Sequence, residues 1–249
     1  VKDVPATLEA ANTLIQAANS NLSKGRWKEA AERFYVLVHV FSNVDPTDTN
    51  ANSQEWLPAA PAVIEWGKPG QYDVLRRLAV SRFSSSNNPI VAEHLLKVTL
   101  LEPVDSETLL AIAPAAAVIE ASLVGPNQQK NLHLAAWGQC VLGLLAYRQE
   151  KSDVAEKWVR LSLTNTGDRS CKLWNNTILA MIDLKRGKTG DGDKRLQEIR
   201  AEIDQWMKSP LRPEFAYRLA WSNWGSARIL LREAEMMHQT MYAKPSKRE

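Results

Sequence analysis

Apolar side chains recur every three or four residues along almost the whole chain, which is the period of an amphipathic helix. The period-two alternation that half-buried strands show is nearly absent. Together with helix start and stop signals, the pattern predicts about ten helices and a longer last one. Their expected ranges are 5–23, 26–42, 53–66, 70–84, 89–101, 106–123, 130–149, 152–165, 170–186, 191–207 and 214–240. The sequence therefore predicts an all-α fold of 10–11 helices.

The breaks between these helices are short and mostly contain glycine or proline. They lie at Gly25, 67–70, 84–89, 125–126, Gly187 and Pro210. Nothing resembles a flexible linker, so we expect one domain over 1–240 and a basic, flexible tail over 241–249. Pro58, Pro61 and Pro114 lie inside or near the start of helical patterns, so we expect those helices to begin later or to kink.

Three segments match the helix pairs of a tetratricopeptide repeat, in which small residues allow close approach and a large apolar residue follows one turn later. The segments are Gly25 to Phe34 with Ala30; Leu142-Gly143 with Ala155 and Val159; and Leu179-Ala180 with Gly187, Leu196 and Ile199. The second and third are about 37 residues apart, close to the period of about 34 for this repeat. The middle, 53–124, lacks the small residues, so we expect degenerate pairs there. We therefore expect a tetratricopeptide-like α-solenoid of antiparallel helix pairs.

Composition excludes several classes of protein. The net charge is only +3, which gives no reason to expect a nucleic-acid partner. No apolar run is long enough for a membrane span. The two cysteines, Cys140 and Cys171, lie in apolar helical patterns and are expected to be buried thiols, which fits a cytoplasmic setting. Because the chain starts at Val1, we expect it to be a piece of a larger protein.

The sequence contains no recognisable catalytic, cofactor or metal motif. None of the four histidines pairs with another at metal-ligand spacing, and Glu93-His94 lacks the second histidine of a metalloprotease motif. The segment 187–192 resembles a phosphate loop, but Ile182 stands where such a loop needs glycine and a helix precedes it. We therefore expect no enzyme, no cofactor and no metal site, and we interpret 187–192 as the turn of a helix hairpin.

A row of aromatic and cationic residues provides the candidate binding site. Aligning the second and third repeats pairs Trp137 with Trp174, and Arg148 with Lys185, while Tyr147 pairs with Leu184. First helices line the concave groove of tetratricopeptide arrays, where partner peptides dock. Trp137, Tyr147, Arg148, Trp174 and Lys185 would then bind an extended peptide that carries acidic groups. Alternatively, the cations complement the helix dipole and the tryptophans pack on the neighbouring hairpin. In both cases we expect Arg148 and Lys185 to be exposed charges at the ends of their helices.

The last predicted helix carries an apolar stripe on one face. Its members are Tyr217, Trp221, Trp224, Arg228 and Leu231, which recur at helical spacing. We expect the stripe to pack inward against 170–207 and cap the array, with Arg228 reaching water at its tip. The competing interpretation is an exposed stripe that docks another subunit, which would make the protein a homo-oligomer.

Taken in order, several segments resemble a helical region of large planctomycete-type bacterial signalling proteins. The matching segments are 25–31 (GRWKEAA), 72–78 (YDVLRRL), 92–94 (AEH), 100–103 (LLEP), 143–148 (GLLAYR), 179–181 (LAM) and 230–235 (LLREAE). In that family the region lies C-terminal to a serine/threonine kinase or β-propeller domain. The chain itself contains no glycine-rich phosphate loop, His-Arg-Asp or Asp-Phe-Gly, so any kinase would lie outside it. The resemblance implies an accessory role in signalling.

Two functions are compatible with these features. The first is a protein-interaction scaffold that presents its groove to a protein or peptide. The second is a ligand-sensing regulatory domain, coupled to an attached kinase, which would require polar groups converging within an apolar wall.

Overall fold

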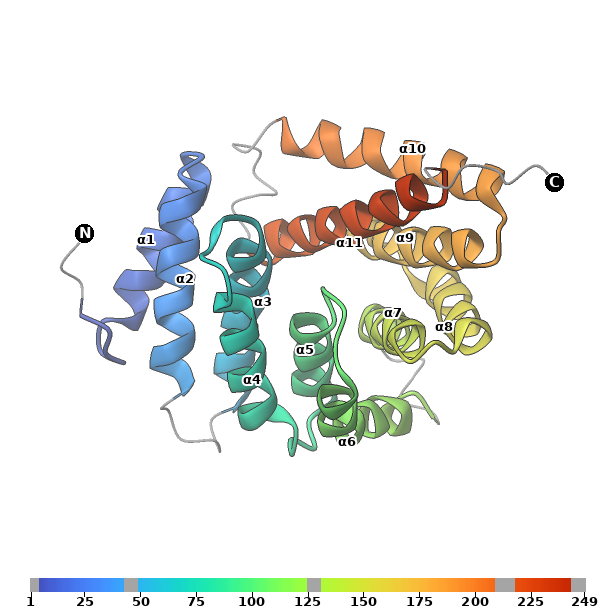
Figure 1. Ribbon diagram of the computed structural model, residues 1–249. Coiled ribbons are helices and arrows are strands. Elements are labelled where there is room, and N and C mark those ends of the chain that lie inside the picture. The colour runs from blue at the N-terminus through green and yellow to red at the C-terminus, as the bar shows by residue number, and fades with distance from the viewer. Residues whose placement is uncertain (1–4, 43–48, 125–130, 209–217, 243–249) are drawn as a thin grey trace.

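The computed structural model describes residues 5–42, 49–124, 131–208 and 218–242, and within them the secondary structure is entirely helical. The helices are α1 (Ala11–Ser23), α2 (Trp27–Ser42), α3 (Thr49–Trp66), α4 (Gln71–Phe83), α5 (Pro89–Thr99), α6 (Ser106–Ser122), α7 (Leu132–Arg148), α8 (Ser152–Asn165), α9 (Arg169–Lys185), α10 (Thr189–Met207) and α11 (Arg218–Tyr242). The predicted all-α fold is confirmed for this part of the chain (Figure 1). None of these helices is long and apolar enough to cross a membrane.

Three expected helix boundaries need correction or fall outside the described residues. The first helix begins at Ala11 rather than at residue 5. The third begins at Thr49 and continues through Pro58 and Pro61, so the expectation of a later start is wrong there. Burial of this stretch, from Trp56 to Val63, outweighs the poor helix propensity of proline. The start of the last helix at 214 and most of the tail over 241–249 lie outside the described residues.

Alternate helices form an inner ring. Helix α3 packs against α5, α5 against α7, α7 against α9, α9 against α11, and α11 returns to α3. The other helices pack outside this ring, each beside its neighbours in sequence. Figure 1 shows the ring seen along its axis, with α1 and α2 outside it at the N-terminal side.

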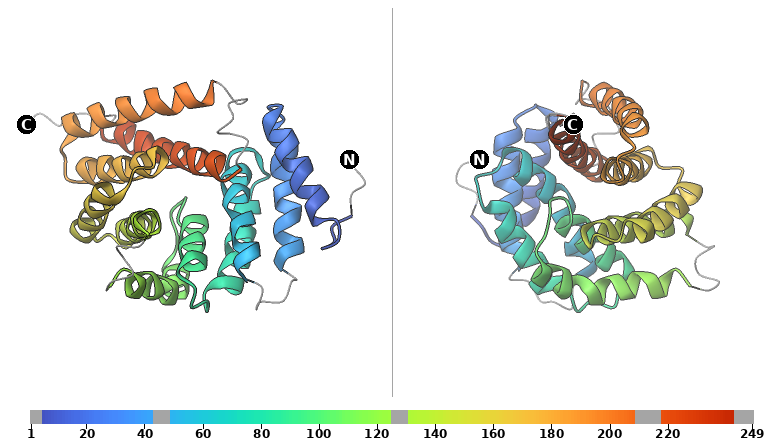
Figure 2. Two further views of the ribbon diagram at one scale, coloured as in Figure 1. Left: turned by 180° about the vertical axis from the view of Figure 1, so that it is seen from behind. Right: turned by 45° about the vertical axis from the view of Figure 1, so that its right-hand side comes forward.

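Helix α11 closes the ring because it spans the two ends of the array. It contacts α3 as well as α9 and α10 (Figures 1 and 2). Each inner helix is therefore packed between other helices of the same chain.

The turns within three helix pairs have the same hydrogen bonds. In each turn the residue with positive φ, namely Gly25, Glu150 or Gly187, donates its N–H to the carbonyl oxygen three residues earlier. The following N–H bonds to the carbonyl oxygen five residues earlier, which satisfies the end of the preceding helix. The three turns join α1 to α2, α7 to α8 and α9 to α10, the same three pairs that the sequence pattern singled out.

Helices α7 and α8 approach closely at Gly143. A Cβ atom on this residue would lie 2.5 Å from Val159 Cγ2 and 3.3 Å from the Ala155 carbonyl oxygen. Glycine is therefore required for this contact, which joins the three residues that the repeat pattern predicted to meet.

Candidate functional site

Of the predicted groove residues, the two tryptophans lie deep in the inner ring. Trp137 and Trp174 meet edge to face, with their ring centroids 5.6 Å apart, and both are buried. The indole N–H of Trp174 donates a 2.9 Å hydrogen bond to the carbonyl oxygen of Asn223 in α11. Both side chains therefore contact the chain's own helices.

Arg148 is a buried anchor for α11. Its Nη2 donates to Glu233 Oε2 at 2.7 Å, and its Nη1 pairs with the other oxygen of the same carboxylate. Nε and Nη2 also donate to the carbonyl oxygen of Leu100, each at 3.1 Å. Only 4% of the Arg148 side chain is exposed, so its expected position as an exposed helix-end charge is wrong. The free carbonyl groups at the end of α5 and the acidic residue of α11 explain this burial.

Tyr147 and Lys185 lie next to each other at the far end of the same face. The Lys185 ammonium lies 4.4 Å from the Tyr147 ring centroid and 2.5 Å from Glu150 Oε2. The Tyr147 hydroxyl donates to the sulfur of Met237 in α11, at 3.3 Å. Thus Tyr147, Arg148 and Trp174 all contact α11, while Lys185 remains partly exposed.

The stripe on the last helix packs inward, as predicted, but on two sides. Trp224 stacks on Trp206 of α10 with 4.1 Å between centroids, which is the expected partner region. Trp221 instead stacks with Trp27 and Trp66, at 6.3 and 6.2 Å, and Arg228 pairs with Glu65 of α3. The predicted packing against 170–207 is therefore confirmed for Trp224, and α11 also contacts α3, which was not predicted. Tyr217 lies outside the described residues.

The inner helices surround a cavity of about 260 Å³. It is lined by Gln54, Leu57, Ile90, Glu93, His94, Lys97, Asn131, His133, Leu134, Trp137 and Asn223. These residues come from α3, α5, α7 and α11, and most belong to the first two turns of their helices or to the cap of α7. The cavity therefore opens at the end of the ring where these helices begin.

Two charged side chains of α5 line this cavity although they are almost completely buried. Glu93 Oε1 and Lys97 Nζ are 2.6 Å apart, one helical turn from each other, with side chains 4% and 8% exposed. The Lys97 ammonium also lies 3.5 Å from the centroid of the Trp137 ring. The second oxygen of Glu93 is 3.5 Å from His94 Nε2, which is longer than an ordinary hydrogen bond.

His94 is neutral at physiological pH in this setting. Burial lowers its pKa to about 4, against a smaller opposing effect of Glu93 and with a contribution from Lys97 in the same direction. Ser53 Oγ lies 2.9 Å from His94 Nδ1, so serine, histidine and glutamate follow one another as in a hydrolase relay. However, Ser53 is 1% exposed and is not among the cavity-lining residues, so its hydroxyl does not reach a molecule in the cavity.

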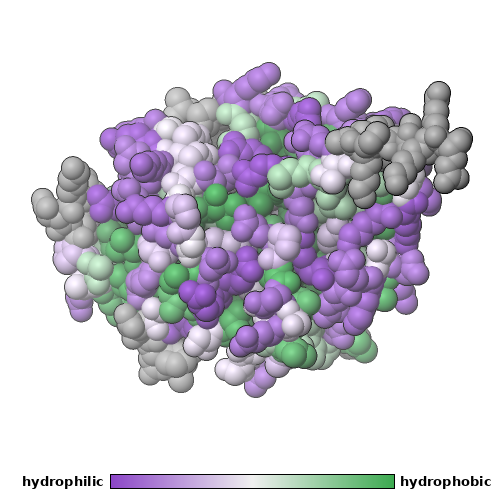
Figure 3. Space-filling view, in the orientation of Figure 1, coloured by the Kyte–Doolittle hydropathy of each residue, from purple (hydrophilic) through white to green (hydrophobic). Residues whose placement is uncertain are grey.

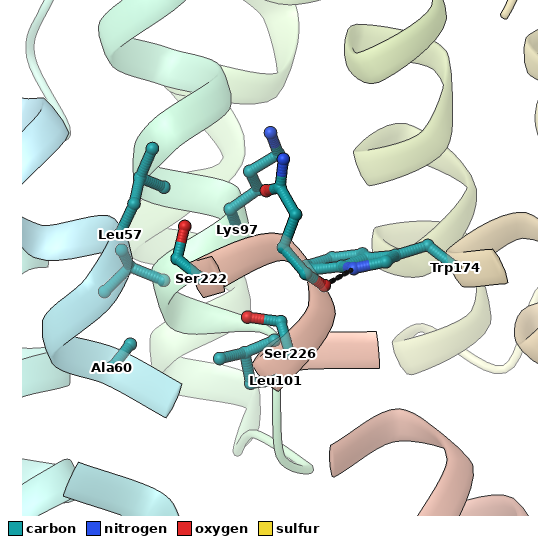
Figure 4. Close-up of a pocket in the computed structure, with 9 residues that line it drawn as sticks. Leu57, Ala60, Lys97, Leu101, Trp174, Ser222 and Ser226 are labelled. Atoms are coloured by element: carbon teal, nitrogen blue, oxygen red, sulfur yellow. Dashed lines mark hydrogen bonds between the residues drawn. The ribbon is translucent and has the colours of Figure 1, made fainter. Parts of the chain in front are cut away.

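A narrow gap, too small for water, continues from the cavity into the ring. Figure 4 shows Ser222 and Ser226 of α11 between Leu57 and Ala60 on one side and Trp174 on the other. Lys97 lines both the gap and the open cavity, so it marks the boundary between them.

The thiols of Cys140 and Cys171 are both free and buried, which confirms their predicted placement. Within the described residues, no group of three or more histidine, cysteine or acidic side chains is arranged to hold a metal ion.

No known family model matches the chain, and comparisons with curated proteins and with solved structures found no match either.

Sequence reasoning missed the cavity although one signal for it was present. Glu93 and Lys97 interrupt the apolar run from Ile90 to Leu101, in a helix whose every residue from Val91 onward is buried. Opposite charges four residues apart inside such a run indicate a buried ion pair. Their position beside Trp137 and Asn223 depends on how the inner helices form the ring, so the sequence pattern could not predict it.

Proposed function

We propose that this chain is a tetratricopeptide-like α-solenoid, closed into a ring by α11, that works as a ligand-binding regulatory domain. The solenoid assignment is supported by the shared hydrogen bonds of the turns at Gly25, Glu150 and Gly187. The resemblance to planctomycete-type signalling proteins adds an accessory role beside an attached kinase or propeller domain.

One observation carries the ligand-binding proposal: Glu93 and Lys97 are buried and yet line an open cavity. Burying an ion pair costs desolvation energy, and replacing such a pair by packed apolar residues is often neutral or stabilising by about 1–4 kcal/mol. Stability alone therefore does not account for charges at the centre of the ring. Charged groups that converge in a cleft with an apolar wall, here Leu57, Ile90 and Leu134, are typical of binding sites.

The test is a thermal-shift screen with nucleotides, sugars, carboxylates, amines and amino acids. A compound that binds only the folded state raises the melting temperature. We expect at least one class to raise it for the wild type and for Lys157→Met, in which an exposed lysine of α8 is changed. The same compound should not stabilise Lys97→Met. A screen in which no compound distinguishes Lys97→Met from the control contradicts the proposal.

A protein-interaction scaffold is the second candidate, and an exposed apolar face of α6 favours it. Leu110 of α6 and Val124, two residues after its end, are 76% and 78% exposed, with exposed Ala113, Ala117 and Ala121 between them at helical spacing. In Figure 3 hydrophobic side chains reach the surface over α6, at the lower edge of the molecule. Exposed apolar stripes of this kind often bind protein.

The scaffold function is tested with the double substitution Leu110→Glu and Val124→Glu. Both side chains are exposed, so the melting temperature should change little. Capture of protein partners from the native lysate should be lost, and unchanged capture would point away from this face. A partner bound through Trp174 and Arg148 instead would have to take the place of α11.

A further inference from the structure

The charges that line the ring cavity restrict the kind of ligand that it can hold. Its wall contains one carboxylate, Glu93, and one ammonium, Lys97. His94 adds no charge near neutral pH because its pKa is lowered to about 4. The formal charge of the two paired side chains is therefore zero. A ligand with a large net charge would be poorly compensated there, and burying an uncompensated charge costs several kcal/mol.

Both charged groups retain hydrogen-bonding capacity toward the cavity. An ammonium has three N–H donors, and Lys97 Nζ lies 2.6 Å from Glu93 Oε1 and 3.5 Å from the centroid of the Trp137 ring. A third donor remains for an anionic oxygen. Glu93 Oε2 is 3.5 Å from His94 Nε2 and can accept a shorter bond from a cationic N–H. The pair can therefore bind one negative and one positive group at adjacent positions without separating.

The field at the cavity mouth favours the carboxylate of a ligand on the side of the helix starts. Ile90 lies in the first turn of α5, and Asn131 is the N-cap residue of α7. The beginning of a helix carries a partial positive charge and attracts anions. This effect supplements Lys97, whereas Glu93 provides the only acidic group among the described residues of the wall.

The volume of the cavity and the chemistry of its wall narrow the class of ligand further. A volume of about 260 Å³ is below the usual lower limit of about 300 Å³ for ligand cavities, so a nucleotide is too large. Leu57, Ile90 and Leu134 form an apolar part of the wall that suits an aliphatic side chain.

From these observations we infer that the ring cavity binds a free α-amino acid with a small or aliphatic side chain. The ligand carboxylate bonds to Lys97 near the helix starts, and the ligand ammonium bonds to Glu93 Oε2. This inference rests on the proposed ligand-binding function and names its ligand class.

The test measures the melting temperature of the full chain with each of the twenty standard L-amino acids. We expect one or more aliphatic amino acids to raise it by about 3 °C or more at millimolar concentration. The two matched probes for L-leucine are 4-methylpentanoate, which lacks the amino group, and 3-methylbutylamine, which lacks the carboxylate. Calorimetric titration should show each analogue binding at least about tenfold more weakly than leucine, since each leaves one buried charge unmatched.

Variants connect binding to the two charges. Lys97→Met and Glu93→Gln should each abolish the shift, while Lys157→Met should keep it. If either cavity variant fails to fold, Asn223→Ala at the mouth serves in its place and should weaken binding. The inference is overturned if no amino acid binds, or if 4-methylpentanoate or the amine binds as tightly as leucine. If another compound class stabilises the wild type but not Lys97→Met, ligand binding stands and the amino-acid assignment alone is wrong.

Discussion

Acidification should destabilise this protein through His94 before its carboxylates titrate. In the folded chain burial lowers the pKa of His94 to about 4, whereas the ordinary value is 6.5. Between these two values the unfolded state binds a proton that the folded state does not. Stability therefore rises with pH in this range and falls as the pH drops below about 6.5. The folded state therefore requires the neutral imidazole of His94, which contacts Ser53 and Glu93.

The expected magnitude follows from the two pKa values. At pH 5 almost all His94 is protonated in the unfolded chain and little is protonated in the folded chain. The difference in proton binding between pH 7 and pH 5 lowers the free energy of unfolding by about 2 kcal/mol. For a chain of this size, that loss corresponds to a fall in melting temperature of about 4 °C.

Urea unfolding at pH 7, 6 and 5 measures the effect, with the extrapolated free energy of unfolding plotted against pH. His94→Gln should have a much flatter plot, whatever its stability at pH 7, because it has no group to protonate. His133→Gln changes an exposed histidine at the cavity mouth and should keep the wild-type slope. Equal slopes for the wild type and His94→Gln would show that His94 is accessible to protons in the folded state and refute its burial.

Three further substitutions test how α11 and the turns hold the ring together. Arg148→Met should lower the free energy of unfolding by about 3–5 kcal/mol because it leaves Glu233 unpaired, and adding Glu233→Met should recover part of this loss in a double-mutant cycle. Glu150→Gly should raise the melting temperature by a few degrees. Glutamate adopts a positive φ there at a cost of about 1 kcal/mol, which glycine avoids, and the substitution removes only an exposed ion pair with Lys185. Trp221→Ala should cost about 3–5 kcal/mol in chemical denaturation, and normal melting with lost self-association would contradict its burial.

The helices were predictable because their signals are local. Apolar periodicity and breaks such as Gly25 and Gly187 act over a few residues, and the structure confirms the hairpins that they delimit. The close contact at Gly143 was also predictable, since a missing side chain in an apolar helix indicates an approaching neighbour. Glu150 has the same conformation as the turn glycines and was not recognised, because a residue with a side chain gives no such signal.

The closure of the ring could not be predicted from local signals. It depends on pairs such as Arg228 with Glu65, which are 163 residues apart and lie on faces that look alike in sequence. The same closure brings Glu233 of α11 onto Arg148 and buries this arginine, which was expected at an exposed helix end. The candidate site thus follows from the topology, while its chemistry follows from two charges in an apolar helix.

The most direct test of ligand binding in the ring uses the indole N–H signals of the nine tryptophans, recorded by NMR on ¹⁵N-labelled protein. The titrant is whichever screened compound raises the melting temperature most. Trp137 lines the cavity, and Trp206, stacked on Trp224 between α10 and α11, is the internal control. We predict that the Trp137 signal shifts in a saturable way while the Trp206 signal stays in place. A Trp137 signal that does not move while the compound stabilises the protein would contradict the cavity as the binding site.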